Sequence, residues 1–298
     1  MNANRFKKFF RKERWNAERY YQMFLYFVII LLSLLCLYPL IYVVSASLMS
    51  VEEWQETAGV FLFPKNPTFE AYEFVIRQQQ LYQSIGVSVK RTVVGSILAV
   101  FSCTVAGYAL SRRDFFGKKV LSILLFITLI YGGGLIPSFL VIEGMGLLNT
   151  FWVFVIPGML SGWNSLVFRQ NFQGVPSEIE ESAMVDGATP LRILWSILMP
   201  MNMPTVAVIL LFCAVGQWNA WFDASIYIES SNADLTPLQL YLQRVFASQK
   251  NDGSSQTLLN VETQKMAVAV IGIVPILCVY PFFQKYFTKG VYVGAVKG

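Results

Sequence analysis

The sequence predicts an all-α integral membrane protein with six transmembrane helices. Of its 298 residues, 55% are hydrophobic and only 14% are charged, whereas soluble proteins carry about 25% charged residues. The mean hydropathy is +0.51. Six long runs contain no charged residue, and each approaches or exceeds the ~20 residues that a helix needs to cross the hydrocarbon. Unbroken apolar runs exclude a β-barrel, whose strands need a polar residue at every second position.

The first predicted span follows a basic, aromatic segment, residues 1–22, and covers residues 23–48. A cleaved signal peptide is the competing interpretation, because Ser45-Ala46-Ser47 resembles a cleavage site. The apolar run is, however, longer than the ~7–15 residues of a signal sequence, so a retained span is expected. The five later spans are expected at Thr92–Ser111, Val120–Ile142, Gly144–Phe168, Ile193–Phe222 and Met266–Gln284.

Basic residues set the expected orientation. Residues 1–22 hold seven of them, the turn at Arg112–Lys119 holds four, and the C-terminal tail adds Lys285, Lys289 and Lys297. Lysine and arginine concentrate on the cytoplasmic side of a membrane protein, so both termini and the polar segment 176–200 are expected in the cytoplasm. This distribution, at the flanks of the spans, also argues against nucleic acid as the reason for the net charge of +5.

Two loops, residues 49–87 and 223–264, carry more acidic than basic residues and are expected outside the cell. The first holds enough aromatic residues to pack as a small cap. The second is expected to contain a helix near Pro237–Ser248 and a mobile stretch at Gln249–Gln256. Residues 23–298 are expected to form a single transmembrane domain.

Residues 176–200 form the long charged segment between two apolar spans and predict a short helix, a turn and a second helix. Ser177 followed by Glu180 has the spacing of a capping box. Gly187 is expected to end the first helix, and Thr189 followed by Pro190 to begin the second. A solvated loop without function is one interpretation, and a docking surface for a soluble partner is the other.

The chain lacks the residues that an enzyme or an ion-driven carrier uses. It has no histidine and no Gly-x4-Gly-Lys-Ser/Thr loop for phosphate. Its charged residues are expected outside the spans or at their rims, whereas ion-coupled carriers usually keep ionisable groups at membrane depth. The driving energy is therefore expected to come from another subunit. The four cysteines fall in apolar runs without metal-type spacing and are expected to be inert thiols: Cys36, Cys103, Cys213 and Cys278.

Polar and aromatic residues within the spans are candidates for a substrate pathway. The segment 217–221, QWNAW, combines amides with flat indole faces of the kind that grip sugars, or else forms an aromatic belt with hydrogen bonds between helices. Three glycines after Tyr131 break the third span and can line a pathway or allow close packing. The candidates are Trp218, Asn219, Trp221, Tyr131 and Asn164.

The polar segment resembles the coupling loop of the permeases of ATP-binding-cassette (ABC) importers. That motif reads Glu-Ala-Ala, two variable residues, Asp-Gly-Ala, and later an isoleucine and a proline. A serine in place of the first alanine is the one departure here. The matching positions are Glu181, Ser182, Ala183, Asp186, Gly187, Ala188, Ile197 and Pro200.

Further stretches resemble carbohydrate-importer permeases of this superfamily, and among them the subgroup that takes up oligosaccharides from alginate or pectin. These stretches are Tyr38-Pro39-Leu40, Ser45–Ser47, Gly107–Gly117, Gly146–Thr150, Trp218-Asn219 and Gly290–Gly298. The resemblance implies the type I ABC importer fold and a subunit, not itself an enzyme, that helps to move an oligosaccharide inward by alternating access.

The resemblance also implies the partners. They are a second, non-identical permease, an ABC ATPase dimer that holds ATP and Mg²⁺, an extracytoplasmic solute-binding protein and the lipid of a bacterial inner membrane; no cofactor or metal is implied for this chain. Residues Glu181–Ala188 would dock into the ATPase, and a tail would reach the ATPase dimer interface: Gly294, Ala295, Val296, Lys297 and Gly298. A permease for a different solute and an ion-coupled secondary transporter remain the alternatives.

Overall fold

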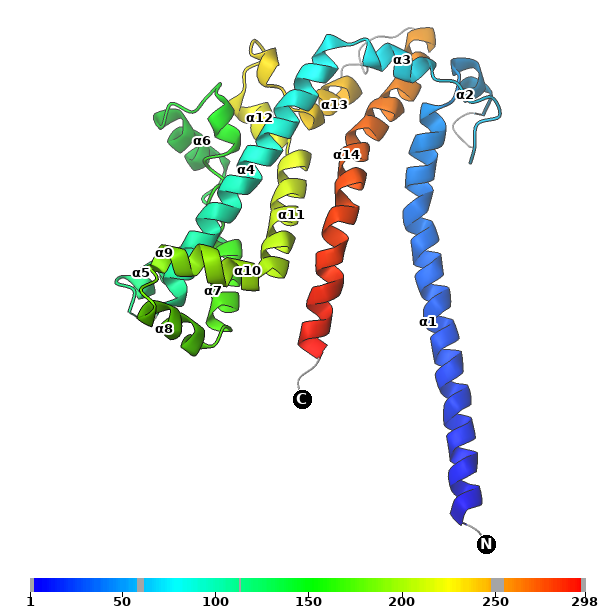
Figure 1. Ribbon diagram of the computed structural model, residues 1–298. Helices are drawn as coiled ribbons and strands as arrows, with labels where there is room; N and C mark the ends of the chain where they lie inside the picture. The colour runs from blue at the N-terminus through cyan, green and yellow to red at the C-terminus, as the bar shows by residue number, and fades with distance from the viewer. Residues whose placement is uncertain (1–2, 58–61, 113, 248–254, 296–298) are drawn as a thin grey trace. The chain divides into compact units, whose positions relative to one another are not determined.

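The computed structural model describes residues 3–57, 62–112, 114–247 and 255–295, and side chains within these ranges except those of 3–17, 255–261, 283 and 285–295. The regular elements among the described residues are all helices, with no strand among them (Figure 1). They divide into two compact units. One comprises Met1–Val75 and Asp252–Val270, and the other comprises Ile76–Asn251 and Ile271–Gly298.

In the first unit, the long helix α1 (Ala3–Ser47) leads into the short helices α2 (Val51–Thr57) and α3 (Glu70–Ile76). The buried carboxylate of Glu53 accepts hydrogen bonds from the backbone N–H groups of Lys65 and Asn66, at 2.5 and 3.2 Å. The hydroxyl groups of Ser47 and Tyr72 lie 2.6 Å apart. These bonds tie the segment after α1 into a small folded cap, in agreement with the expectation from its aromatic residues.

Three helices are long and apolar enough to cross a membrane within the described chain. They cover Glu18–Ser47 of α1, Gln79–Ser111, which is the whole of α4, and Glu262–Phe282 of α14 (Ser255–Ala295). The first and the last confirm two predicted spans. Helix α4 begins 13 residues before the predicted Thr92, so Lys90 and Arg91 lie inside the helix rather than before it.

The predicted break in the third span is confirmed, whereas the prediction of the fourth span as one apolar run gave no sign of the break found there. The third consists of α5 (Lys118–Ile130) and α6 (Leu135–Gly144), separated by the glycines after Tyr131, two of which have positive φ angles. The fourth contains the 3₁₀ helix η1 (Phe151–Phe154), an irregular stretch, and α7 (Gly162–Gln173). Proline and glycine at 157 and 158 fit this break, since neither favours a helix interior.

The fifth predicted span is bent by 87°. Its first part consists of α9 (Pro190–Ile193), the π-helical turn η2 (Leu194–Leu198) and α10 (Met199–Met201), and its second part is α11 (Met203–Asn219). Pro200 and Pro204 lack the N–H groups that would continue the hydrogen-bond ladder across this region. The bend separates the residues next to the polar segment from those that rise as α11.

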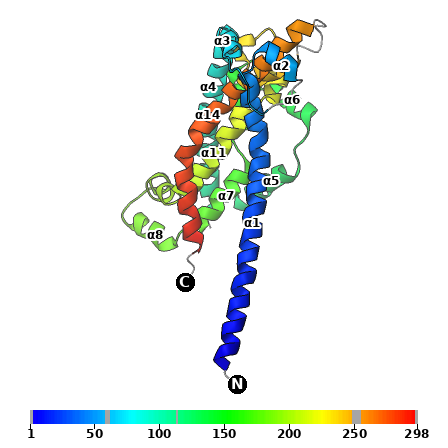
Figure 2. The same ribbon diagram turned by 90° about the vertical axis from the view of Figure 1, so that its right-hand side faces the viewer.

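Helix α4 packs along α7 and α11 in the second unit (Figures 1 and 2). At the end near Ser111, a buried cluster joins Tyr108, Phe168, Phe172 and Leu194. Near its start lie α12 (Phe222–Tyr227), the 3₁₀ turn η3 (Ala233–Leu235) and α13 (Leu238–Ala247). Ser88 Oγ accepts a 2.8 Å hydrogen bond from the Leu238 N–H group, which fixes α13 against α4.

Helix α13 confirms the helix expected near Pro237–Ser248. Residues 248–254, and with them most of the stretch expected to be mobile, lie outside the described residues, while Ser255 and Gln256 open α14.

Candidate functional site

The polar segment folds as α8 (Ser177–Val185), a turn, and α9, but the capping box is wrong. Pro176 occupies the N-cap position of α8 and Ser177 is the first helical residue, with no side-chain cap. The side chain of Glu180 turns away from the start of its own helix and forms an ion pair with Arg112 at the end of α4.

The turn after α8 confirms the predicted stop. Gly187 has a φ of +80°, a left-handed conformation that favours glycine. The N–H groups of Gly187 and Ala188 donate to the carbonyl groups of Met184 and Ala183, the two bonds that define a Schellman motif. The predicted start of α9 is also confirmed, because the Thr189 side chain accepts from the Arg192 N–H group and Pro190 follows the cap.

Helix α8 is anchored on one face and exposed on the other. Ala183 is buried in the cluster around Phe168 and Phe172, and Ala188 packs against it. Glu181, Ser182, Asp186 and Gly187 are exposed. Of the six predicted docking residues, four are therefore available to a partner, and the two alanines instead face the interior of this chain.

Exposed apolar side chains complete this face. Val185 is 88% exposed, Met184 50% and Leu191 63%. The first two occupy the variable positions of the motif, so their type carried no signal. Exposed apolar groups beside acidic ones are typical of a surface that binds another protein. We use the name docking surface, after the role expected of it, for Glu181, Ser182, Met184, Val185, Asp186, Gly187 and Leu191.

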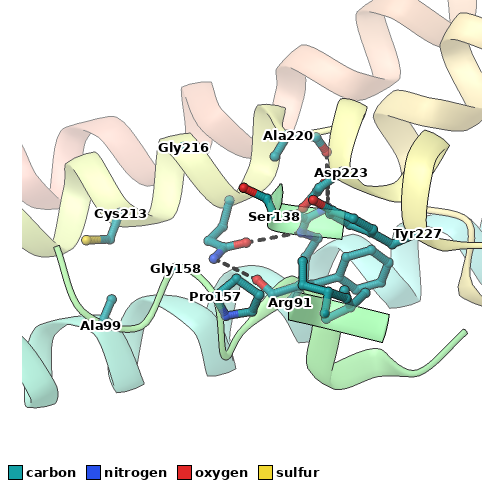
Figure 3. A pocket seen from close by; sticks show the side chains of 14 residues that line it. Arg91, Ala99, Ser138, Pro157, Gly158, Cys213, Gly216, Ala220, Asp223 and Tyr227 are labelled. Atoms are coloured by element: carbon teal, nitrogen blue, oxygen red, sulfur yellow. Dashed lines mark hydrogen bonds and ion pairs between the residues drawn. The ribbon is translucent and has the colours of Figure 1, made fainter. Parts of the chain in front are cut away.

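A cavity of about 420 Å³ lies beside the middle of α4 and is bordered by α6, the segment around η1, α11 and α12 (Figure 3). Its lining mixes apolar groups with hydrogen-bonding side chains from four segments. These include Arg91, Ser138, Gln217, Asp223 and Tyr227.

Arg91 is the central polar residue of this cavity, with a side chain only 1% exposed. Its guanidinium donates to both carboxylate oxygens of Asp223, at 2.6 and 3.3 Å, and to the carbonyl of Ala220 at 3.2 Å. Its Nε–H group donates to Gln217 Oε1 at 3.1 Å, and its charge lies 4.5 Å from the centre of the Phe154 ring. Figure 3 shows Arg91, Ala220 and Asp223 close together in the cavity. We refer to Arg91, Gln217 and Asp223 as the arginine cluster.

The sequence did not point to the arginine cluster. Arg91 was expected at the rim of a span, and its ion-pair partner follows it by 132 positions. Gln217 belongs to the segment 217–221, but its amide is committed within the chain, since Nε2 also donates to the Phe154 carbonyl at 3.1 Å. The available signal was the position of Arg91 directly before the uncharged run that begins at Thr92, because a charge that becomes buried there requires a partner.

The five pathway candidates are not brought together, and none of them lines the cavity. Trp218 is buried and its indole N–H group donates to the Gly272 carbonyl of α14 at 3.0 Å, which matches the helix-packing alternative. Asn219, Trp221 and Tyr131 are exposed. Asn164 donates to Cys213 Sγ at 3.5 Å beside the cavity.

The predicted ATPase-contacting tail is described only in part. Gly294 and Ala295 end α14 as backbone, and Val296, Lys297 and Gly298 lie outside the described residues.

Comparison with known proteins assigns the family. Residues 86–292 match the family model described as binding-protein-dependent transport system inner membrane component. The polygalacturonan/rhamnogalacturonan transport system permease protein YtcP of Bacillus subtilis (strain 168) is 35% identical over 94% of this chain and 99% of its own. Protein LplC of the same organism is 36% identical over 87% of this chain and 89% of its own.

A solved structure agrees with these sequences. One chain in the crystal structure of a bacterial ABC transporter involved in the import of the acidic polysaccharide alginate superposes with a TM-score of 0.83 and 30% identity, over 91% of this chain and 98% of that chain. The protein has the type I ABC importer permease fold, and it belongs to the family of binding-protein-dependent transport system inner membrane components.

Proposed function

We propose that this chain is one of two non-identical permeases of an ATP-driven importer, and that the importer carries an acidic oligosaccharide derived from pectin or alginate. One relative is a polygalacturonan/rhamnogalacturonan permease, and one similar structure belongs to an importer of the acidic polysaccharide alginate, and both support this substrate class. The single observation that carries the proposal is the docking surface on α8, which is exposed on one face and anchored on the other.

The proposed arrangement places both termini and α8 in the cytoplasm and the loops 49–87 and 223–264 outside. Its support is the excess of lysine and arginine at the N-terminus, in the turn at Arg112–Lys119 and in the tail. In this orientation the docking surface faces an ABC ATPase dimer, and the loops face a solute-binding protein.

The ATPase subunits would bind ATP and Mg²⁺ and supply the energy of transport. This chain would receive their movement at Glu181, Asp186 and the apolar side chains beside them, and pass it to the helices that line the substrate pathway. Asn219, Trp221 and Tyr131 are exposed in the isolated chain and thus available to the second permease or to the sugar.

Val185→Asp tests the docking surface. Val185 is the most exposed large apolar side chain of α8. A carboxylate at this position would lose its hydration if an interface covered it. We expect the variant to reach the membrane at normal levels but to lose most of the ATPase that co-purifies with the wild-type chain. Lys119→Gln, which changes an exposed charge in the first turn of α5, is the control and should retain the ATPase. Full retention by Val185→Asp would contradict the docking role.

Uptake assays with purified sugars test the substrate class. Cells that carry the complete importer are expected to take up oligogalacturonate or oligoalginate, and a neutral oligosaccharide of equal length serves as the control. Preferential uptake of the neutral sugar would contradict the acidic substrate while leaving the permease function intact.

A further inference from the structure

Helix α4 carries Arg91 in its first half and ends at the C-cap Arg112, and each arginine holds a different element. Arg91 and Arg112 are 21 positions apart. At 1.5 Å per residue this separation is about 31 Å, close to the ~30 Å thickness of the hydrocarbon. Both arginines pair with a carboxylate, one on α8 and one at the start of α12.

The joint near the end of α4 connects it to the docking helix. Arg112 forms an ion pair with Glu180, whose side chain is 7% exposed, and its guanidinium lies 4.4 Å from the centre of the Tyr108 ring. The Tyr108 ring packs edge-to-face on Phe172, within the cluster that also buries Ala183. A cation at the end of α4 and an anion in the first half of α8 also match the dipoles of the two helices.

At two glycines, α4 packs closely against its neighbours. A Cβ atom built on Gly107 would lie 2.5 Å from Phe168 Cβ and 2.9 Å from the Ser165 carbonyl oxygen of α7. One built on Gly95 would lie 2.7 Å from Gln217 Nε2 of α11. The helix therefore touches α7 near one arginine and the arginine cluster near the other.

We propose that the Arg112–Glu180 pair is a positioning joint through which displacement of α8 reaches α4, and that α4 conveys it to the arginine cluster at the cavity. The inference rests on the proposed function, which supplies the force at α8. It also chooses between two routes. The competing route is the turn through Gly187 and Thr189, which connects α8 directly to α9.

The test uses the complete importer reconstituted with its ATPase and its solute-binding protein. Arg112→Gln and Glu180→Gln are expected to retain the ATPase and its basal ATP hydrolysis. Stimulation of hydrolysis by the sugar-loaded binding protein is expected to fall about tenfold, a typical size for coupling between sites. Arg112→Lys, which keeps the charge, is expected to recover much of the stimulation that Arg112→Gln loses, and Lys119→Gln is expected to leave it unchanged.

A second readout follows α12 beside the arginine cluster. Ser225 is exposed on α12, two positions after Asp223, so a cysteine there reports on that end of the cavity. In a background without the four native cysteines, we expect the labelling rate of Ser225→Cys to change on addition of ATP. This response is expected to vanish when Arg112→Gln is added.

The outcomes separate the two proposals. Normal stimulation and a normal labelling response in Arg112→Gln would show that the turn to α9 suffices and would overturn the joint. Loss of the ATPase from Arg112→Gln would also overturn it, since the pair would then serve docking rather than transmission. Failure of the wild-type chain to bind an ATPase would instead contradict the proposed function itself.

Discussion

Gly95 of α4 lies so close to Gln217 of α11 that a Cβ atom at position 95 would fall 2.7 Å from Nε2 and 2.9 Å from Cδ of the glutamine. Gln217 uses that amide to accept from Arg91 and to donate to the Phe154 carbonyl. The absence of a side chain at position 95 is therefore a condition for the geometry of the arginine cluster.

Gly95→Ala is expected to displace the Gln217 amide and to weaken both hydrogen bonds. Each such bond contributes about 1 kcal/mol, and the loss should appear as a lower unfolding temperature of the purified protein and slower uptake. Gly86→Ala, also in α4, meets nothing within 4 Å and is the matched control. It should be neutral or slightly stabilising, because alanine favours helix more than glycine does. Equal effects of the two substitutions would contradict the close approach.

Arg91→Met is expected to destabilise the chain by about 2–3 kcal/mol, at or below the low end for a fully buried pair, because it leaves the half-buried Asp223 carboxylate without its ion-pair partner. The double variant Arg91→Met with Asp223→Leu removes both charges and is expected to recover much of that loss. Thermal unfolding in detergent measures both. A double variant that is less stable than Arg91→Met alone would show that Asp223 contributes mainly through other contacts, such as its bond to the Ala224 N–H group.

Gly187→Val is expected to abolish transport while the protein remains in the membrane. A β-branched residue at a φ of +80° is strained, although nothing lies within 4 Å of the added Cβ atom in this chain. Asparagine adopts a positive φ more readily than valine does, so Gly187→Asn should keep a measurable fraction of the uptake. Unimpaired uptake by the valine variant would remove the turn from the coupling role.

Trp218 is buried and the adjacent Asn219 is exposed, so substitution of Trp218 is expected to lower stability and substitution of Asn219 to report on the substrate pathway. Trp218→Phe removes the bond to Gly272 and should cost about 1 kcal/mol of stability without a change in substrate preference. Asn219→Cys should react with a maleimide at a rate that depends on ATP and on sugar. A rate insensitive to both would place Asn219 outside the pathway.

The local chemistry of the polar segment was predictable because its signals are short-range. A glycine that ends α8 and a threonine–proline pair that begins α9 act through their own backbone and nearest neighbours. The capping box failed for a long-range reason. Glu180 had the correct spacing from Ser177, yet its carboxylate forms an ion pair with Arg112, 68 positions earlier in the chain.

Apolar composition identified membrane-spanning regions but not their internal geometry. The composition of an apolar run does not distinguish one continuous helix, as in α4, from two helical pieces bent by 87°, as in α9–α11. The arginine cluster was hidden for a related reason, since its members lie on α4, α11 and α12 and meet only when these helices pack. Exposure also depends on packing, which explains why Ala183 is buried while its neighbour Met184 is exposed.

The central claim, that α8 receives force from a cytoplasmic ATPase, is tested most directly by a cysteine at position 185. In a background without native cysteines, Val185→Cys should react with a membrane-impermeant maleimide in inside-out vesicles and not in intact cells. It should also cross-link to the ATPase subunit in the assembled importer. Labelling from outside the cell, or a fully assembled importer in which no cross-link to the ATPase forms, would contradict the account.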